Sequence, residues 1–259
     1  MTKAANDAEV VAFDLDELEY AERYQRWVTA AVLPYLGSRI LEFGSGTGNM
    51  SRWLPRRERL ILTEPDEHLR ARLVERCREY RLGPPLVSVE AFDPESELPE
   101  RFADERIDTA VSFNVLEHIR NDAAVLTRLA ALLRGTSAPG PRRLVLFVPA
   151  HQWAYGTLDT AFGHERRYSG VGLRRLLNSV APDAAISVRY FNLLGLPGWF
   201  ILGKILRRDT ISPRSIRAFE RICPVYRPVD DFLHQRLRVP AGQSLIGVAE
   251  WAGASPSPP

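Results

Sequence analysis

Residues 40–49 read ILEFGSGTGN, and this stretch decides the fold of the chain. Ile40, Leu41 and Phe43 give the apolar pattern of a buried strand, and a glycine loop follows at once in residues 44–48. We expect a helix directly after the loop. A strand that ends in a glycine turn is how open α/β folds bring backbone close to a nucleotide-like ligand.

Two details of the stretch indicate which ligand it binds. The glycines follow the pattern G-x-G-x-G at Gly44, Gly46 and Gly48, whereas dinucleotide sites use G-x-G-x-x-G. Glu42 stands just before the loop, where a carboxylate would repel a pyrophosphate but suits a ligand with an ammonium and a sulfonium group. The stretch therefore predicts a site for S-adenosylmethionine.

The composition fits one enzyme-sized domain. A chain of 259 residues that is 45% hydrophobic can bury a full core, and a net charge of +2 gives no electrostatic argument for nucleic acid. Cys77 and Cys223 make no disulfide framework, and the polar start of the chain has no apolar leader, so we expect a cytoplasmic protein. No His, Asp and Glu triad occurs at ligand spacing, so the sequence implies no metal.

Strand and helix patterns alternate along most of the chain. Besides residues 39–43, strands are expected in six segments: 59–63, 86–90, 107–113, 143–148, 186–191 and 244–251. Helices are expected at 18–33, from Pro65 onward, at 122–134 and after Ser169. This alternation predicts an α/β fold with a Rossmann-like, doubly wound, parallel sheet of seven strands.

The chain is expected to form a single domain. An N-terminal helical cover takes residues 1–37, and the cofactor-binding half takes 38–150. The substrate-side half, 151–251, carries an insertion at 192–240, and a disordered tail follows at 252–259. Ligands in such sheets bind outside the carboxyl ends of the strands, so the residues there are the candidates for the site.

The arrangement resembles the class I S-adenosylmethionine-dependent methyltransferases over roughly residues 20–251. The next acidic strand end, Glu64, lies 22 residues after Glu42 (64 − 42), as in that family. The resemblance implies that Glu64 accepts hydrogen bonds from both ribose hydroxyls of the cofactor, a task that suits a carboxylate. It also implies that the loop backbone at Gly44 and Gly46 lies against the cofactor.

Four further cofactor contacts are implied by the same resemblance. Asp93 would accept from the exocyclic amine of adenine, and Phe92 would pack on the ring. Asn114, which ends the fourth strand, matches the position that lines the methionine portion of the cofactor. Tyr24, on the first helix, resembles a residue that closes over the cofactor.

A second segment, residues 163–168, reads GHERRY and resembles a GHxRRY segment of bacterial methyltransferases in small-molecule, glycan and natural-product pathways. An oxygen acceptor needs a base, and a histidine near neutral pKa is the natural one. His164 is the preferred catalytic residue, because it lies in the substrate-side half. His118 and His151 are the other candidates near the substrate.

The arginines of this segment have two possible roles. Arg166 and Arg167 would hold an anionic group of the substrate, and next to His164 they would lower the pKa of its imidazole. They are equally suited to ion pairs that fix the loop, with Glu117 and Asp159 as available partners. His118 is more often structural than catalytic in such a position.

The start of the insertion is strongly apolar. Residues 192–206 read NLLGLPGWFILGKIL, and Arg207 and Arg208 follow. The stretch is shorter than the ~20 residues that a membrane span needs. A core helix or a lid is the favoured interpretation. The alternative is membrane contact through residues 193–208, as an interfacial helix with its arginines at lipid headgroups.

The expected function is methyl transfer from S-adenosylmethionine to a small molecule, most readily at oxygen. A natural product, a glycan or a lipid-linked intermediate fits as substrate. One alternative is a methyltransferase-fold enzyme that uses the bound cofactor for cyclisation or decarboxylation. A second alternative is an NAD(P)-dependent oxidoreductase that uses Glu64 for the ribose, although the glycine spacing and Glu42 argue against it. The acceptor molecule, the acceptor atom and the oligomeric state do not follow from the sequence.

Overall fold

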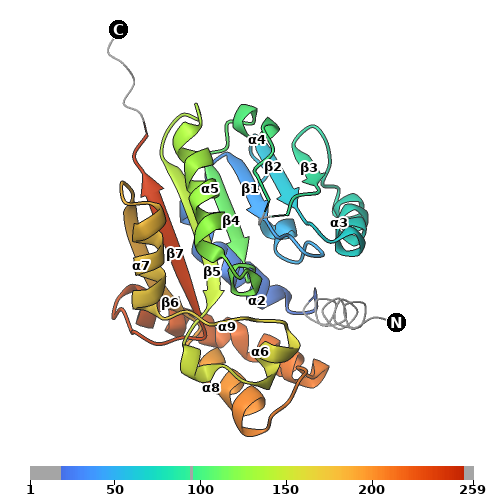
Figure 1. Ribbon diagram of the computed structural model, residues 1–259. Coiled ribbons are helices and arrows are strands. Elements are labelled where there is room, and N and C mark those ends of the chain that lie inside the picture. Colours follow the sequence, from blue (N-terminus) through green and yellow to red (C-terminus); the bar gives the residue numbers. More distant parts are fainter. Residues whose placement is uncertain (1–18, 94–95, 254–259) are drawn as a thin grey trace.

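The computed structural model describes residues 19–93 and 96–253, and they form one seven-stranded sheet with helices on both faces (Figure 1). The strand order is β3-β2-β1-β4-β5-β7-β6. The strands are β1 Arg39–Phe43, β2 Arg59–Thr63, β3 Val87–Glu90, β4 Thr109–Phe113, β5 Arg142–Pro149, β6 Ala185–Phe191 and β7 Ser244–Trp251. The predicted fold class and strand number are confirmed. The expected parallel pairing holds for β1–β5, whereas β7 runs antiparallel to both of its neighbours.

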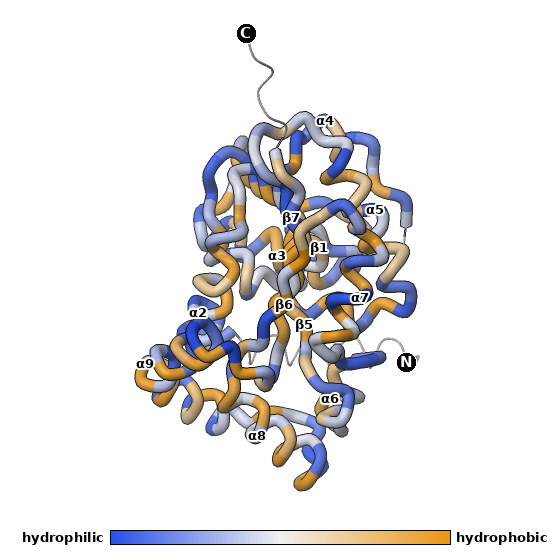
Figure 2. The backbone as a smooth tube through the Cα atoms, turned by 90° about the vertical axis from the view of Figure 1, so that its left-hand side faces the viewer, coloured by the Kyte–Doolittle hydropathy of each residue, from blue (hydrophilic) through white to orange (hydrophobic). Residues whose placement is uncertain are grey.

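The strands of this sheet alternate their apolar side chains between two cores. In β1, Leu41 and Phe43 face one core and Ile40 faces the other, which is the period-two alternation of a strand. The first core is closed by α5 (Asp122–Gly135) and α7 (Gly170–Val180). The second is closed by α2 (Glu22–Val32), α3 (Glu67–Glu79) and α9 (Pro213–Gln235). Figure 2 shows hydrophobic segments running along the central strands.

Local sequence signals explain where several helices begin. Ser169 caps α7 as expected, because its side chain accepts from the backbone N–H of Gly172. Asp66, rather than the expected Pro65, opens α3 by accepting from the backbone N–H of Leu69. The expected helix after the glycine loop is wrong: only one 3-10 turn forms there, η2 (Ser51–Trp53). Pro55 disfavours helical backbone at the preceding residue, and Leu54 is extended.

The insertion folds into helices at the carboxyl-end side of the sheet. It contains α8 (Gly195–Phe200), the π-helix η5 (Ile201–Ile205) and α9, which packs on α2. Figure 1 shows α6 (Thr157–Ala161), α8 and α9 below the sheet, on the side where β4 and β5 end. In the described part of the chain, no helix is long and apolar enough to span a membrane.

The interpretation of the apolar start as a core helix is only partly right. The carbonyl of Gly203 accepts from the Thr157 hydroxyl, and Lys204 donates to the carbonyl of Trp153, so this stretch covers α6 and the short helix η4 (Gln152–Ala154). Ile205 and Leu206 are nevertheless exposed. The apolar start of the insertion therefore covers part of residues 151–251, while its Ile205 and Leu206 side chains face solvent.

Candidate active site

The glycine loop is held between β1, β2 and the segment after β4. The backbone N–H of Ser45 donates to the carbonyl of Thr63 at 2.8 Å. Gly44 has φ +70°, and a Cβ there would lie 2.5 Å from a methyl group of Val115. Glycine is therefore required at this position both for backbone conformation and for space.

Glu42 is a buried acid beside this loop. Its residue is 2% exposed, and its carboxyl group accepts from the hydroxyls of Ser45 and Ser51. Burial raises the pKa of Glu42 to about 7, and the two serine hydroxyls partly oppose this effect. A group of this kind gains from a nearby cation, so it fits the ammonium group of S-adenosylmethionine.

Glu64 is tied to the same loop from the end of β2. Its Oε2 accepts from the backbone N–H of Gly46 at 2.8 Å, and its Oε1 accepts from that of Asp66 at 3.1 Å. Burial raises the pKa of Glu64, and the backbone hydrogen bonds act in the opposite direction. The loop and the acid expected to bind ribose are thus parts of one hydrogen-bonded unit.

The remaining cofactor candidates lie at the strand ends in different environments. Asp93 is exposed after β3, whereas Phe92 is buried, with its ring centroid 5.7 Å from that of Phe102. Phe92 therefore supports the core, and its expected contact with adenine remains a prediction. Asn114 is exposed at the end of β4, has φ +52°, and donates its backbone N–H to the carbonyl of Phe147.

Tyr24 on α2 packs among aromatic rings of the second core. Its ring packs against Trp27, Phe191 and Phe219. Burial raises the pKa of Tyr24 to about 12, and its hydroxyl hydrogen-bonds to side chains at the end of β6 and the start of β7. Its expected role in closing over the cofactor remains a prediction.

The GHERRY segment clamps the chain that follows β4. The backbone N–H of Glu165 donates to the carbonyl of Glu117 at 2.9 Å, and the carbonyl of Gly163 accepts from Nδ1 of His118 at 3.1 Å. The hydroxyl of Tyr168 lies 3.2 Å from the carbonyl of Leu116. Because of these contacts, residues that are 46 positions apart, such as His118 and His164 (164 − 118), meet at one place.

The two arginines of the segment are engaged within the protein. Arg166 pairs with Asp122 at 3.1 Å and donates to the carbonyl of Arg120. The side chain of Arg167 is 1% exposed, donates to Asp159 at 2.6 Å and donates to the carbonyl of Ala150. The expected grip of Arg167 on a substrate anion is therefore wrong for this geometry, and the ion-pair alternative with Asp159 holds.

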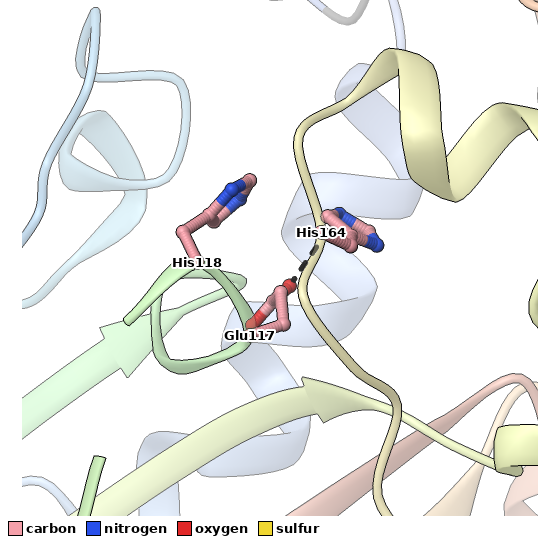
Figure 3. Close-up of side chains that lie close together, drawn as sticks. All are labelled: Glu117, His118 and His164. Atoms are coloured by element: carbon pink, nitrogen blue, oxygen red, sulfur yellow. Dashed lines mark ion pairs between the residues drawn. The ribbon is translucent and has the colours of Figure 1, made fainter. Parts of the chain in front are cut away.

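His164 is oriented by a buried carboxylate. Its Nδ1 lies 2.9 Å from Oδ1 of Asp159, which also accepts from Arg167; the second oxygen of Asp159 accepts from Trp199 and from the backbone of Gly156. Of the two arginines expected next to His164, Arg167 binds the same oxygen of Asp159, whereas Arg166 pairs with Asp122. Carboxylates face both ring nitrogens, because Nε2 lies 3.9 Å from Glu117 Oε1 (Figure 3).

Glu117 is the least satisfied polar side chain of the site. It is 0% exposed, and neither of its carboxyl oxygens has a hydrogen-bond partner within residues 19–93 and 96–253. Burial raises its pKa to about 7, with His164 acting in the opposite direction. Beside it, burial and then the charge of the neighbouring His164 lower the pKa of His118 to about 4.

Glu117, His118 and His164 form a three-residue cluster. Each offers one ligand atom, and these atoms all lie within 4.8 Å of one another. Figure 3 shows Glu117 and His118 on the turn after β4, and His164 on the facing loop, with Glu117 directed toward His164. Our expectation of no clustered triad is wrong, because the fold assembles one from segments that sequence spacing does not connect.

His151 lies outside this cluster. It follows β5 with φ +65°, and its ring stacks on Tyr190 at 5.0 Å between centroids. Burial, and then the charge of Arg167, lower the pKa of His151. Its Nε2 is buried and has no hydrogen-bond partner among the residues that the structure describes.

The sheet order, the glycine loop and the acids at the ends of β1 and β2 define a class I S-adenosylmethionine-dependent methyltransferase fold. A protein-family model described as "Methyltransferase domain" matches residues 17–180, which is more than half of the chain. The chain belongs to this methyltransferase family, and its cofactor is S-adenosylmethionine. No curated protein matches the chain.

Solved structures share the fold at low sequence identity. The methyltransferase domain of the bacterial protein CtHen1 is 12% identical, with a TM-score of 0.55 over 90% of this chain and 100% of that one. An S-adenosylmethionine-dependent methyltransferase from Mesorhizobium loti is 16% identical, with a TM-score of 0.53 over 86% and 96%. The [4+2]-cyclase SpnF is 14% identical, with a TM-score of 0.52 over 88% and 79%.

Proposed function

We propose that the protein transfers the methyl group of S-adenosylmethionine to an oxygen atom of a small molecule. The observation that carries this proposal is the unit of Glu42, the glycine loop and Glu64, which offers two buried acids beside bare backbone. S-adenosylmethionine supplies a methyl group bonded to a positively charged sulfur, which is already a good leaving group. The work left to the protein is to bind, to align the acceptor and to exclude water.

The cofactor-binding residues have separate tasks in this proposal. Glu42 attracts the ammonium group, and Glu64 accepts from the two ribose hydroxyls through lone pairs that its backbone hydrogen bonds leave unused. Asp93 and Asn114 take the adenine amine and the methionine portion. Gly44 and Gly46 let the loop backbone approach the cofactor closely.

The acceptor is proposed to lie at the carboxyl end of β4. The Glu117, His118 and His164 cluster is there, and α6 and α8 cover that side of the sheet (Figure 1). An acceptor hydroxyl must lose its proton as the new O–C bond forms. His164 is the candidate to receive it, because Asp159 holds Nδ1 and so leaves Nε2, which faces Glu117, as the nitrogen that can act.

Small-molecule substrates are supported by the covered shape of this half. The insertion places α8 and η5 over α6, which narrows the approach to the strand ends. Arg166 retains a partly exposed guanidinium, so it remains a candidate for an anionic substrate group. A lid over an apolar substrate fits the Trp199 and Phe162 rings that lie next to His164.

The test is methyl transfer to a panel of small hydroxylated molecules, including sugars, phenols and lipid-linked glycans. Formation of S-adenosylhomocysteine in step with a methylated product supports the proposal. Glu64→Ala is the matched inactive control, and Glu67→Ala is the control for an exposed acid nearby. A panel that gives S-adenosylhomocysteine only with amine or carbon acceptors would refute oxygen as the acceptor atom.

A second function is favoured by one comparison. The fold is also that of the [4+2]-cyclase SpnF, so a bound cofactor that is not consumed is a real alternative. The same assay separates the two functions. Substrate conversion without S-adenosylhomocysteine would favour the non-methylating reaction.

A further inference from the structure

The cluster after β4 brings together the donor atoms of a metal site. One carboxylate and two imidazoles each offer a ligand atom, and these atoms all lie within 4.8 Å of one another. Donor atoms around a tetrahedral zinc ion lie roughly 3.4 Å apart, given metal–ligand bonds of about 2.0–2.1 Å. Small side-chain rotations would therefore close the site. Glu117 and His118 are adjacent on η3 (Leu116–His118), so the two come as a preformed pair.

The carboxyl group of Glu117 is an independent indication of a missing partner. It is completely buried, neither oxygen has a hydrogen bond, and it points toward His164 (Figure 3). Buried carboxylates in proteins are paired, hydrogen-bonded or bound to metals, because an isolated one is costly. A cation at this position would supply what the surrounding side chains do not.

His164 is held in the way that metal-binding histidines are held. Nδ1 is bonded to Asp159, so Nε2 is the nitrogen that faces Glu117. Metal-ligating histidines almost always donate their other N–H to a carboxylate, a carbonyl or a water, which fixes the ring. Asp159 is itself fixed by Arg167, Trp199 and the backbone of Gly156. The residues that would orient a ligand histidine around a metal ion are thus already in place.

We propose that Glu117, His118 and His164 bind one divalent transition-metal cation, with Asp159 as the positioning residue that orients His164. Two imidazoles and one carboxylate suit zinc, cobalt or ferrous iron, whereas magnesium and calcium prefer oxygen ligands alone. Three protein ligands leave at least one coordination position open.

The role of this site rests on the proposed function. The cluster lies at the end of β4, where the acceptor is placed, so the open position takes the oxygen of the acceptor hydroxyl. A bound cation lowers the pKa of that hydroxyl, and the proton passes to water. The oxygen then forms its bond to the methyl group while the bond from sulfur to that carbon breaks, which leaves a neutral thioether.

The test is calorimetric titration of the full, chelator-treated protein with zinc chloride, alongside cobalt binding followed by visible absorption. We expect one zinc ion per chain in the wild type. Glu117→Gln and His164→Gln should weaken zinc binding on the order of 100-fold or more. Asp159→Asn should weaken it about 10–100-fold, the usual effect of losing an outer carboxylate. His118→Gln is informative because part of this residue is exposed, so its loss threatens the fold less.

His68→Gln is the matched control, since His68 is an exposed histidine on α3, outside the cluster. Zinc affinity should be unchanged in this variant. Thermal unfolding of each variant shows whether it is folded. No zinc binding by the folded wild-type protein would overturn the proposal, and so would equal zinc affinity in folded His118→Gln and wild type.

Failure of the metal site and failure of the proposed function are distinguishable. Binding of S-adenosylmethionine is measured on the same chelator-treated protein. Cofactor binding and methyl transfer without any zinc binding would refute the metal and return His164 to the role of general base. Zinc binding without methyl transfer to any acceptor would support the metal site and refute the proposed function.

Discussion

Glu42 and Glu64 end two neighbouring parallel strands, and both carboxyl groups are buried beside the glycine loop. Their environments differ in a way that matters for binding. Glu42 is held by serine hydroxyls, which can turn toward or away from it, whereas Glu64 is held by two backbone N–H groups of fixed direction. Under the proposed function, we expect the charge of Glu42 to respond to the ligand and Glu64 to set the orientation of the ligand.

Removal of the Glu64 carboxylate should weaken binding of the cofactor without unfolding the protein. Glu64→Ala loses charge-assisted hydrogen bonds to the ribose, which are worth on the order of 1.5–3 kcal/mol each. Calorimetry should show this loss for S-adenosylmethionine, with little change for the exposed neighbour variant Glu67→Ala. Wild-type affinity in Glu64→Ala would remove Glu64 from the ribose site.

Cofactor affinity should depend on pH through Glu42. Burial raises the pKa of this acid to about 7, so part of it is neutral at pH 6. An ammonium group binds the carboxylate form, so binding should strengthen as pH rises toward 7 and should level off above it. The slope approaches tenfold per pH unit at the acidic end. Glu42→Gln should flatten this dependence in calorimetry at pH 6, 7 and 8, and an equal slope in both proteins would contradict the assignment.

At the scale of elements, the glycine loop and the GHERRY segment are the two pieces that shape the site. The loop adopts positive φ angles at Gly44, Gly46 and Gly48. The GHERRY segment has little regular structure of its own and is fixed by side-chain and backbone bonds to the turn after β4. Under the proposed function, the loop presents backbone to the cofactor, and the GHERRY segment presents the imidazole of His164 to the acceptor.

Gly46→Val should leave a folded protein that no longer binds cofactor. Gly46 has φ +54°, which a β-branched residue adopts only with strain, and its N–H is bonded to Glu64. Gly83→Ala is the control, because a Cβ there would meet no atom within 4 Å. Circular dichroism checks the fold and calorimetry the binding. Unchanged cofactor affinity in Gly46→Val would show that the glycine loop does not contact the cofactor.

The clamp should contribute measurably to stability through Tyr168. Its hydroxyl lies 2.8 Å from Oδ2 of Asp122, and the residue is buried. Tyr168→Phe removes a hydrogen bond to a charged group, so urea unfolding should show a loss of about 1.5–3 kcal/mol. Tyr20→Phe, at an exposed residue, should change nothing. Equal midpoints for both variants would mean that the clamp is held by other contacts.

The sequence predicted local features well and long-range ones poorly. The seven strands follow from the period of the apolar residues, and the start of α7 follows from the capping chemistry of Ser169. The unit of Glu42, the glycine loop and Glu64 follows from spacing within about 25 residues. All three are properties of short segments of the chain. The Asp159 and His164 pair was missed as an orienting contact, because the sequence offered Asp159 only as a partner for the arginines, whereas its Oδ1 binds both Arg167 and His164. The lack of a hydrogen bond to the Glu117 carboxyl group, among the described residues, depends on which side chains do not reach it. No sequence pattern contains that information.

At the scale of the whole molecule, the two halves are joined by one continuous sheet and by α9 lying on α2. The backbone N–H groups of Arg23 and Tyr24 donate to Glu220, and the Trp27 indole donates to Asp231. The N-terminal cover is thus attached to the insertion, so changes on the substrate side reach the helix that carries Tyr24.

Cofactor product should stabilise the whole fold. A ligand at 100 times its dissociation constant adds about 2.7 kcal/mol when it binds only the native state. S-adenosylhomocysteine should therefore raise the midpoint of thermal unfolding for the wild type and much less for Glu64→Ala at the same concentration. A shift of equal size in both proteins would indicate binding away from the strand ends.

The position of β7 has a consequence for how the chain assembles. In the described sheet, β6 touches only β7, and β7 lies between β5 and β6 although it follows both in the chain. While the protein emerges from the ribosome, a chain made through residue 243 holds β6 with no strand to pair with. The last strand must enter a gap between two strands made earlier, antiparallel to each. Pairing of β6 therefore waits for β7, and a chain stopped short of Ser244 should be a target for proteolysis along residues 185–243.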